Sequence, residues 1–248
     1  DLPWRKTRDP YKILGSEAML QQTQVSRVLK KYPEFLSLFP TAKALTKAPI
    51  TKVLEAWQGL GYNRRALNLK RATEAVMKDF GGVFPKTAEE LESLPGVGQS
   101  TRGAIMAFSF GVPTAFIETN IRSIYLHHFF KDKKGVHDRD IIPVIEETLD
   151  RKNPRDWYYA LMDYGVHIKQ TLPNPSRRSK HHAKQSAFKG SNREVRSLIL
   201  SSVLKGKCDR KALDKVIGKT SHDVEKNIRA LIKEGFIVET RGSLMPKS

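Results

Sequence analysis

The stretch GSEAMLQQTQV, residues 15–25, contains residue types that could act on a nucleic acid. Gln21 and Gln24 follow Glu17 by four and seven residues, so these side chains would share one face of a continuous helix. Gln22 would lie about 100° around that helix. A carboxylic acid can transfer a proton, and glutamine amides can enter a duplex and meet base edges. The alternative is a solvated helix face.

A second stretch, PKTAEELESLPGVGQSTRGAI, predicts a short helix, a glycine-containing turn and a further helix. Thr87 and Glu90 have the spacing of a capping box. The segment Leu94–Gly98 ends the first helix, and the second should begin near Gln99 or Ser100. The two glycines of the turn permit positive φ and leave N–H groups uncovered beside a helix N-terminus, an arrangement that binds phosphate. A purely structural turn is the alternative.

The composition indicates a polyanionic partner. The 248 residues include 44 Lys and Arg against 26 Asp and Glu, for a formal charge of +18. Such an excess is typical of proteins that bind a phosphate backbone, although it says nothing about the fold. Cys208 is the only cysteine, which excludes an intrachain disulfide and any cysteine-ligated cluster. The N-terminal sequence has no signal-peptide core and no run is long enough to span a membrane, so we expect an intracellular protein.

The elements that must position these residues are mostly helical. Apolar residues recur at helical spacing, and alternating strand patterns are scarce before residue 235. We therefore predict an all-α fold with a domain at 1–175, a basic linker at 176–190 and a small domain at 191–248. The helical periodicity is carried by Ile13, Leu14, Ala18 and Val25, by Val53, Leu54 and Trp57, and by Ile141, Val144, Ile145 and Leu149.

The last 58 residues predict a winged helix. Three amphipathic segments are followed by two short apolar runs around Arg241-Gly242, which is a hairpin signal. Whether this unit binds DNA or only packs on the rest of the chain stays open. From Tyr164 to Arg193 the chain has no acid, and within this stretch we interpret residues 171–193, TLPNPSRRSKHHAKQSAFKGSNR, as an irregular connector that lies on phosphates or is merely solvated.

Several motifs together resemble a known family. LPGVGQSTRGAI, followed about 20 residues later by FIETNIRSI, is similar to the helix–hairpin–helix glycosylase superfamily that includes endonuclease III. LPWR, SEAMLQQTQV, GLGYNRRALNL, GGVFP and ALMDYG resemble the MutY branch, the adenine DNA glycosylases, more closely. The resemblance covers residues 2–168 in colinear order and implies a two-lobed helical fold.

The resemblance implies roles for individual residues. Glu17 would be the acid that protonates the leaving adenine, and Gln21 the finger inserted into the duplex where the base is extruded. Glu118 would be the carboxylate that stabilises the positive charge on the sugar, although the family has an aspartate at this position. The alternative for Glu118 is a helix-start glutamate facing solvent. The residues implied to contact DNA are Gln21, Gln22, Tyr62, Arg64, Arg65, Gly96, Val97, Gly98, Gln99, Ser100 and Asn120.

The departures from the family pattern concern the lyase step and the cofactor. Family members that also cut the strand have a lysine at the position of Ser100, so the serine implies a monofunctional glycosylase. The four cysteines of the family's iron–sulfur cluster are absent, and we expect the final 60 or so residues to be too few for the Nudix-like domain that MutY-type enzymes usually have. We expect no transition metal at His127-His128 or His181-His182, because adjacent residues on a helix do not face one another. A monovalent cation at the hairpin carbonyls remains possible.

These observations predict a monomeric base-excision glycosylase for adenine opposite 8-oxoguanine or guanine in double-stranded DNA. Two alternatives remain. One is a glycosylase of the same fold for uracil, thymine or a modified base, since Glu118 departs from the family. The other is a non-catalytic protein that binds damaged DNA, against which the retained Glu17 argues.

Overall fold

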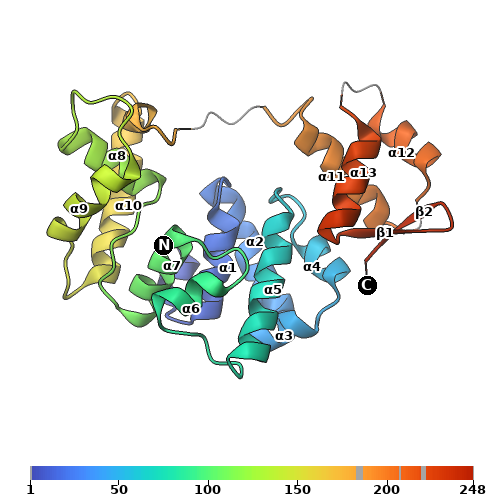
Figure 1. The fold of residues 1–248 in the computed structure, drawn as a ribbon, viewed down its shortest axis with the longest axis horizontal. Helices are drawn as coiled ribbons and strands as arrows, with labels where there is room; N and C mark the ends of the chain where they lie inside the picture. The colour runs from blue at the N-terminus through green and yellow to red at the C-terminus, as the bar shows by residue number, and fades with distance from the viewer. Residues whose placement is uncertain (1, 183–186, 207, 219–221, 248) are drawn as a thin grey trace. The chain divides into compact units, whose positions relative to one another are not determined.

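The computed structural model describes residues 2–182, 187–206, 208–218 and 222–247 (Figure 1). Its elements are helices together with one two-stranded antiparallel sheet near the C-terminus, which confirms the mostly helical prediction. The chain forms two compact units: residues 1–17 with 83–184, and residues 18–82 with 185–248. Each unit thus combines segments that are distant in sequence, and the linear boundaries expected at residues 175 and 190 stay a prediction.

The first unit is entirely helical in its described part. Its elements are η1 (Pro3–Lys6), the start of α1 (Pro10–Leu20), α6 (Ala88–Ser93), α7 (Gln99–Ile105), a π-helical turn (Met106–Phe110), α8 (Thr119–His128), α9 (Asp138–Thr148), α10 (Pro154–Thr171) and η3 (Pro175–Arg178). Helix α8 packs on α9, α10 and η3, and α10 also contacts the π-helical turn. The expected helix around Ile141 and Ile145 is therefore α9, and both of these side chains are buried.

Close packing between α8 and α10 depends on Gly165. A Cβ atom on this residue would lie 2.5 Å from the carbonyl oxygen of Asn120, much closer than real Cβ atoms approach backbone. The Phe116 ring packs on Tyr158 of α10, with ring centroids 4.2 Å apart, and Tyr158 donates a hydrogen bond to the Thr114 carbonyl. These contacts fix the backbone on both sides of Glu118, because residues 114–120 can move only with α10.

The second unit contains two groups of helices. The first group is α2 (Val25–Leu38), α3 (Ala42–Lys47), α4 (Ile50–Ala56) and α5 (Arg64–Asp79). The second is α11 (Asn192–Leu204), α12 (Arg210–Ile217) and α13 (Val224–Glu234), followed by β1 (Ile237–Thr240) and β2 (Ser243–Pro246). Trp57 is fully buried in the first group, with its ring 5.8 Å from that of Phe35.

The C-terminal segment has the predicted order of three helices and a hairpin. Thr240 pairs with Ser243, and the turn between them has positive φ at both Arg241 and Gly242, the geometry favoured in two-residue hairpins. Gly235, with φ +86°, ends α13 at the predicted position. Ile228, Leu231 and Phe236 are buried, so this segment has its own apolar core. The winged-helix prediction therefore matches the observed elements.

One expectation about the first motif is wrong. The helix that carries Glu17 ends at Leu20, Gln22 adopts φ +53°, and Gln24 is the extended residue that precedes α2. The spacing rule assumed one continuous helix, so Glu17, Gln21 and Gln24 do not share a helix face. The Arg65 guanidinium stabilises the turn at this point. It donates hydrogen bonds to the carbonyls of Ala18, Met19 and Gln21 at 2.5–2.9 Å, and so satisfies the end of α1.

The segment without acids, which begins within α10 and continues beyond it, is more ordered than a simple connector. Tyr164–Thr171 belongs to α10, and η3 folds back on α8, where the Ser123 and Ser176 hydroxyls are 2.6 Å apart. Arg178 donates to carbonyls at the end of α8 and just beyond it, at Leu126, Phe130 and Lys131. The expectation of an irregular connector at 171–193 is therefore wrong for Pro175–Arg178, which form η3. Residues 183–186 of that segment lie outside the described residues.

Among the described residues, no helix has both the length and the apolar character needed to cross a membrane.

Candidate active site

Glu17 lies in the last turns of α1, with its side chain half-buried. Desolvation by the surrounding protein, reinforced by the charge of Glu118, raises the pKa of Glu17 to about 8. A carboxyl group with this pKa holds its proton at neutral pH and can donate it. The structure therefore gives Glu17 the protonation state that a general acid needs.

Glu118 is the N-cap residue of α8 and is also half-buried. Its Oε1 accepts hydrogen bonds from the backbone N–H groups of Asn120 and Ile121 at 2.6 and 2.7 Å, and Oε2 lies 3.3 Å from the Asn120 amide nitrogen. Desolvation raises the pKa of Glu118, whereas these N–H groups and the charges of Lys169 and Arg122 act in the opposite direction. The expected alternative of a solvent-facing helix-start residue is half right: Glu118 starts the helix but turns its carboxylate inward.

The two carboxyl groups belong to the same compact unit and interact electrostatically. The charged form of Glu118 is favoured by two backbone N–H groups, the positive end of α8 and the Lys169 ammonium, which oppose the desolvation that raises its pKa. Its negative charge then helps to keep the proton on Glu17. Two carboxyl groups with different environments, one acting as acid and one as carboxylate, are the arrangement used for cleavage of glycosidic bonds.

Lys169 is a site residue that the sequence analysis missed. Its Nζ donates a 2.7 Å hydrogen bond to Oδ1 of Asn120, and its charge faces Glu118. Desolvation lowers the pKa of Lys169, and Glu118 opposes this effect. Lys169 follows the ALMDYG motif on α10, and no local pattern links it to Glu118, which is 51 positions earlier in the chain. Only the packing of α10 on α8 brings them together.

Tyr159 is a second missed residue. Its hydroxyl is buried and has no hydrogen-bond partner among the described residues, and desolvation raises the pKa of Tyr159 to about 12. The charge of Glu17 reinforces that rise, so the phenol lies within electrostatic reach of the acid. The Tyr159 ring stacks on Phe108 with centroids 4.5 Å apart, and the Arg5 guanidinium lies 4.6 Å from its centroid. A donor held this firmly beside the acid is available to a ligand.

The hairpin has the predicted geometry in most respects. Thr87 caps α6 by accepting the N–H of Glu90, and α7 begins at Gln99. Gly96 has φ +80°, but Gly98 is extended, so only one of the two glycines uses positive φ. The N–H of Val97 is used within the turn, in a 3.0 Å bond to the Leu94 carbonyl. Phosphate binding at Gly96, Val97, Gly98, Gln99 and Ser100 stays a prediction.

Ser100 is the second residue of α7 and is half-buried. Gly98, not Ser100, occupies the N-cap position, which leaves the serine without the capping role that could have explained it. Nothing in the described contacts assigns it another structural role. That the serine, in place of the family's lysine, makes the enzyme monofunctional stays a prediction.

The residues expected on the DNA side of the second unit have structural partners. Beyond α1, Arg65 donates to Thr23, Leu60 and Gly61, and burial lowers the pKa of its guanidinium to about 10. Tyr62 has φ +48°, and its hydroxyl accepts a 3.1 Å hydrogen bond from Arg193. Arg64 forms a 2.8 Å ion pair with Glu234 of α13. The observed contacts of Arg65 make it a cap for the C-terminal end of α1. DNA contact by Tyr62, Arg64 or Arg65 stays a prediction.

Residues 16–154, which include both carboxyl residues of the candidate site, match a known protein family. A model of the HhH-GPD superfamily of base excision DNA repair proteins matches residues 16–154, more than half of the chain. This chain belongs to the HhH-GPD superfamily. The match includes both carboxyl residues and the hairpin, whereas Tyr159 and Lys169 lie beyond its end.

Curated relatives of this HhH-GPD protein include adenine DNA glycosylases. The one from Mycobacterium tuberculosis is 40% identical over 172 residues, which cover 68% of this chain and 57% of that protein. The one from Buchnera aphidicola subsp. Baizongia pistaciae is 33% identical over 171 residues, or 67% of this chain and 48% of that protein. The human enzyme is 32% identical over 68% of this chain and 33% of its own length. The chain spans about half the length of the first two relatives.

Solved structures support the same fold. A thermostable thymine-DNA glycosylase superposes with a TM-score of 0.64 and 28% identity, over 72% of this chain and 83% of that one. A non-covalent endonuclease III–DNA complex superposes with a TM-score of 0.52 and 19% identity over 74% and 79%, which shows the fold alone.

Proposed function

We propose that this protein is a monofunctional DNA glycosylase that hydrolyses the N-glycosidic bond of adenine mispaired with 8-oxoguanine or guanine in base excision repair. The observation that carries the proposal is the pair of interacting carboxyl groups: the pKa of Glu17 is raised to about 8, and Glu118 is held by the N–H groups of Asn120 and Ile121. The similarity to adenine DNA glycosylases supports adenine as the base.

In this mechanism Glu17 donates its proton to a nitrogen of the leaving base as the bond from C1′ to the base breaks. The bonding electrons leave with the base, and the sugar becomes a cation. The carboxylate of Glu118 stabilises this cation, and the N–H groups of Asn120 and Ile121 with the charge of Lys169 favour its ionised form against desolvation. A water then adds to C1′ and loses a proton, which restores the acid of Glu17 directly or through solvent.

Two further points belong to the proposal. Ser100 has no amine with which to attack C1′, so the product is an intact abasic site. An iron–sulfur cluster does not fit this chain: it requires four thiolates, and the single cysteine, Cys208, is buried beside β2. We propose that the contacts of η3 with α8 do the structural work at the end of α10. The partner would be double-stranded DNA with a mispaired or damaged base, bound by an intracellular monomer.

Thymine is the second candidate base. The thymine-DNA glycosylase is 28% identical, and the aligned region covers 83% of that protein, more than of the adenine glycosylases compared above. Glu118 in place of the family aspartate also permits a changed substrate. Both reactions would use the same two carboxyl groups, so the base has to be determined by assay.

The test is single-turnover excision on duplexes with A opposite 8-oxoguanine, A opposite G, T opposite G and U opposite G, with and without alkali. Wild type, Glu17→Gln and the surface control Glu55→Gln would be compared. We expect alkali-dependent cleavage of the A strand, a loss of about 1,000-fold or more in Glu17→Gln, and no change in the control. Excision of T or U would overturn the substrate, and binding without any excision would overturn catalysis.

A further inference from the structure

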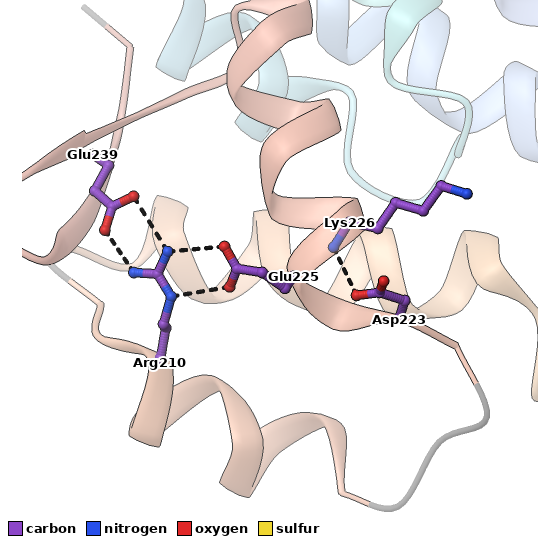
Figure 2. Close-up of polar contacts among 5 residues, drawn as sticks. All are labelled: Arg210, Asp223, Glu225, Lys226 and Glu239. Carbon is purple, nitrogen blue, oxygen red and sulfur yellow. Dashed lines mark hydrogen bonds and ion pairs between the residues drawn. The ribbon is translucent and has the colours of Figure 1, made fainter.

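The acids of the C-terminal segment are engaged in structural contacts. Figure 2 shows the Arg210 guanidinium between the carboxylates of Glu225 and Glu239, with nitrogen–oxygen distances of 2.6–3.2 Å. Asp223 caps α13 by accepting the backbone N–H of Lys226 at 2.8 Å. Glu234 pairs with Arg196 and Arg64, each at 2.8 Å. Each of these negative charges is therefore held by a local partner.

The basic residues of α13 are distributed differently. Its fully exposed positions are Lys226, Arg229 and Lys233, and all three are basic. They are spaced i, i+3 and i+7, so they form one stripe along the helix. Among the described residues, no carboxylate forms an ion pair with any of them. In Figure 2 the side chain of Lys226 extends away from the carboxylate of Asp223, to which only its backbone is bound.

We propose that this stripe is a second DNA-binding surface, by which the C-terminal segment holds duplex DNA outside the site of base excision. The stripe spans about 10 Å at 1.5 Å per residue, and an α-helix fits the major groove, which is about 12 Å wide. Arg241, exposed at the turn of the hairpin, adds a positive charge on the wing. Helix α13 follows α12 as the second helix of a helix-turn-helix does, the element that enters the groove.

A nearby hollow supports an oxygen-rich partner. Its volume is about 410 Å³, and Arg196, His222 and Lys226 line it together with Asn192, Asp223, Asn227 and Ala230. The two basic side chains in this lining, Arg196 and Lys226, are of the kind that contacts phosphates. A membrane surface is disfavoured, because a helix that binds one exposes an apolar face, whereas Ile228 and Leu231 of α13 are buried.

The inference rests on the proposed action on DNA, but its test does not require excision. Binding of an undamaged duplex would be measured by fluorescence anisotropy at several salt concentrations. The stripe variant is Lys226→Gln/Arg229→Gln/Lys233→Gln. The matched control is Lys205→Gln/Lys211→Gln/Lys215→Gln, which removes the same charge from exposed positions of the same segment outside α13. Circular dichroism would establish that both variants fold, and single-turnover excision at saturating protein would be measured in parallel.

We expect the stripe variant to bind the duplex about 10- to 100-fold more weakly near physiological salt, with the slope of log Kd against log salt reduced by about 2–3. The control should change Kd by less than about threefold, and excision at saturation should be unchanged in both. If the triple variant does not fold, Lys226→Gln and Lys233→Gln alone should each reduce the slope by about 1. Equal slopes and affinities in stripe and control variants would overturn the proposal. So would a stripe variant that binds anionic lipid vesicles more weakly but binds the duplex as tightly as wild type. Absence of excision in the wild type would overturn the proposed function and leave this result intact.

Discussion

Two pairs of glutamates in this molecule have opposite titration behaviour. Glu17 and Glu118 come from α1 and α8 of the first unit, and desolvation raises the pKa of both. Glu225 and Glu239 come from α13 and β1, and the hydrogen bonds of Arg210 hold the pKa of both below the ordinary value. The first pair has no cation bonded to either carboxylate among the described contacts, whereas the second pair surrounds one.

The difference shows how one residue type serves two purposes. A half-buried carboxyl pair without a directly bonded cation keeps a proton at neutral pH, which costs stability and provides an acid. An exposed pair on either side of an arginine stays charged and holds a helix to a strand. Perturbation by desolvation therefore points to the reactive site, and perturbation by an ion pair points to structure.

After the loss of Glu17 itself, the largest effect on the excision rate should come from removing the charge of Glu118 while its cap is kept. Glu118→Gln retains a side-chain oxygen that can accept the N–H groups of Asn120 and Ile121. We expect the single-turnover excision rate to fall about 100- to 1,000-fold, because the sugar cation loses its counter-charge. Glu118→Asp should lose less, and Glu89→Gln on the surface of α6 should lose nothing. A rate within threefold of wild type would reduce Glu118 to a helix cap.

The pH profile of excision should have an alkaline limb set by Glu17. The pKa of Glu17 is raised to about 8, so the acid is protonated below that pH and the rate should be limited by its loss above it, by about tenfold per pH unit. In Glu118→Gln this limb should move to lower pH, because the charge of Glu118 helps to raise the pKa of Glu17. An alkaline limb that does not move would show that the charge of Glu118 does not raise the pKa of Glu17.

Adjacent tyrosines of α10 offer a smaller test. Tyr159→Phe removes a buried hydroxyl that has no hydrogen-bond partner in the described part of the chain, so we expect the Tm to rise by about 1–3 °C while excision slows by about 3- to 30-fold. Tyr158→Phe is the control, since its hydroxyl bonds the Thr114 carbonyl and the Phe116 N–H, and its loss should lower the Tm. Equal Tm changes in both variants would show that the Tyr159 hydroxyl has a partner in solution.

Glu17→Gln should be more stable than wild type although it is inactive. Above its ordinary pKa of 4.5 the unfolded chain ionises Glu17, and the folded chain does so only near pH 8. The cost to folding therefore grows as pH rises between these values. We expect the Tm of Glu17→Gln to exceed that of wild type by about 2–4 °C at pH 8, with little difference near pH 4. Scanning calorimetry across pH would detect this, and a constant difference would contradict it.

The smallest effect should come from Arg210→Met. The lowered pKa values of Glu225 and Glu239 contribute stability that is present above their ordinary pKa and is lost as pH falls. The variant should lower the Tm by about 1–3 °C at pH 7, with the difference vanishing in acid, and should leave the rate of excision unchanged. The Tm difference of Glu17→Gln thus arises from a raised pKa, whereas that of Arg210→Met arises from lowered pKa values. A larger Tm loss would mean that the cluster also holds the C-terminal core.

Local patterns in the sequence determined much of this protein. The capping residue Thr87, the glycine that ends α13 and the turn at Arg241-Gly242 were predictable because each acts on its immediate neighbours. Glu17 and Glu118 could be named from the family resemblance, since their motifs are short and continuous. The helix face shared by Glu17, Gln21 and Gln24 could not be trusted, because Arg65, 44 residues beyond Gln21, ends that helix.

Only the tertiary structure decided which protonation states the site holds. Glu17 and Glu118 have the same ordinary pKa, and burial in the fold determines how strongly each is desolvated and which charges face it. The packing of α10 on α8 brings Lys169 to Asn120, and the Tyr159 hydroxyl, within electrostatic reach of Glu17, has no hydrogen-bond partner among the described residues. Spacing along the chain describes neighbours within a helix, whereas desolvation and charge depend on residues that are far apart in sequence and meet only in the fold.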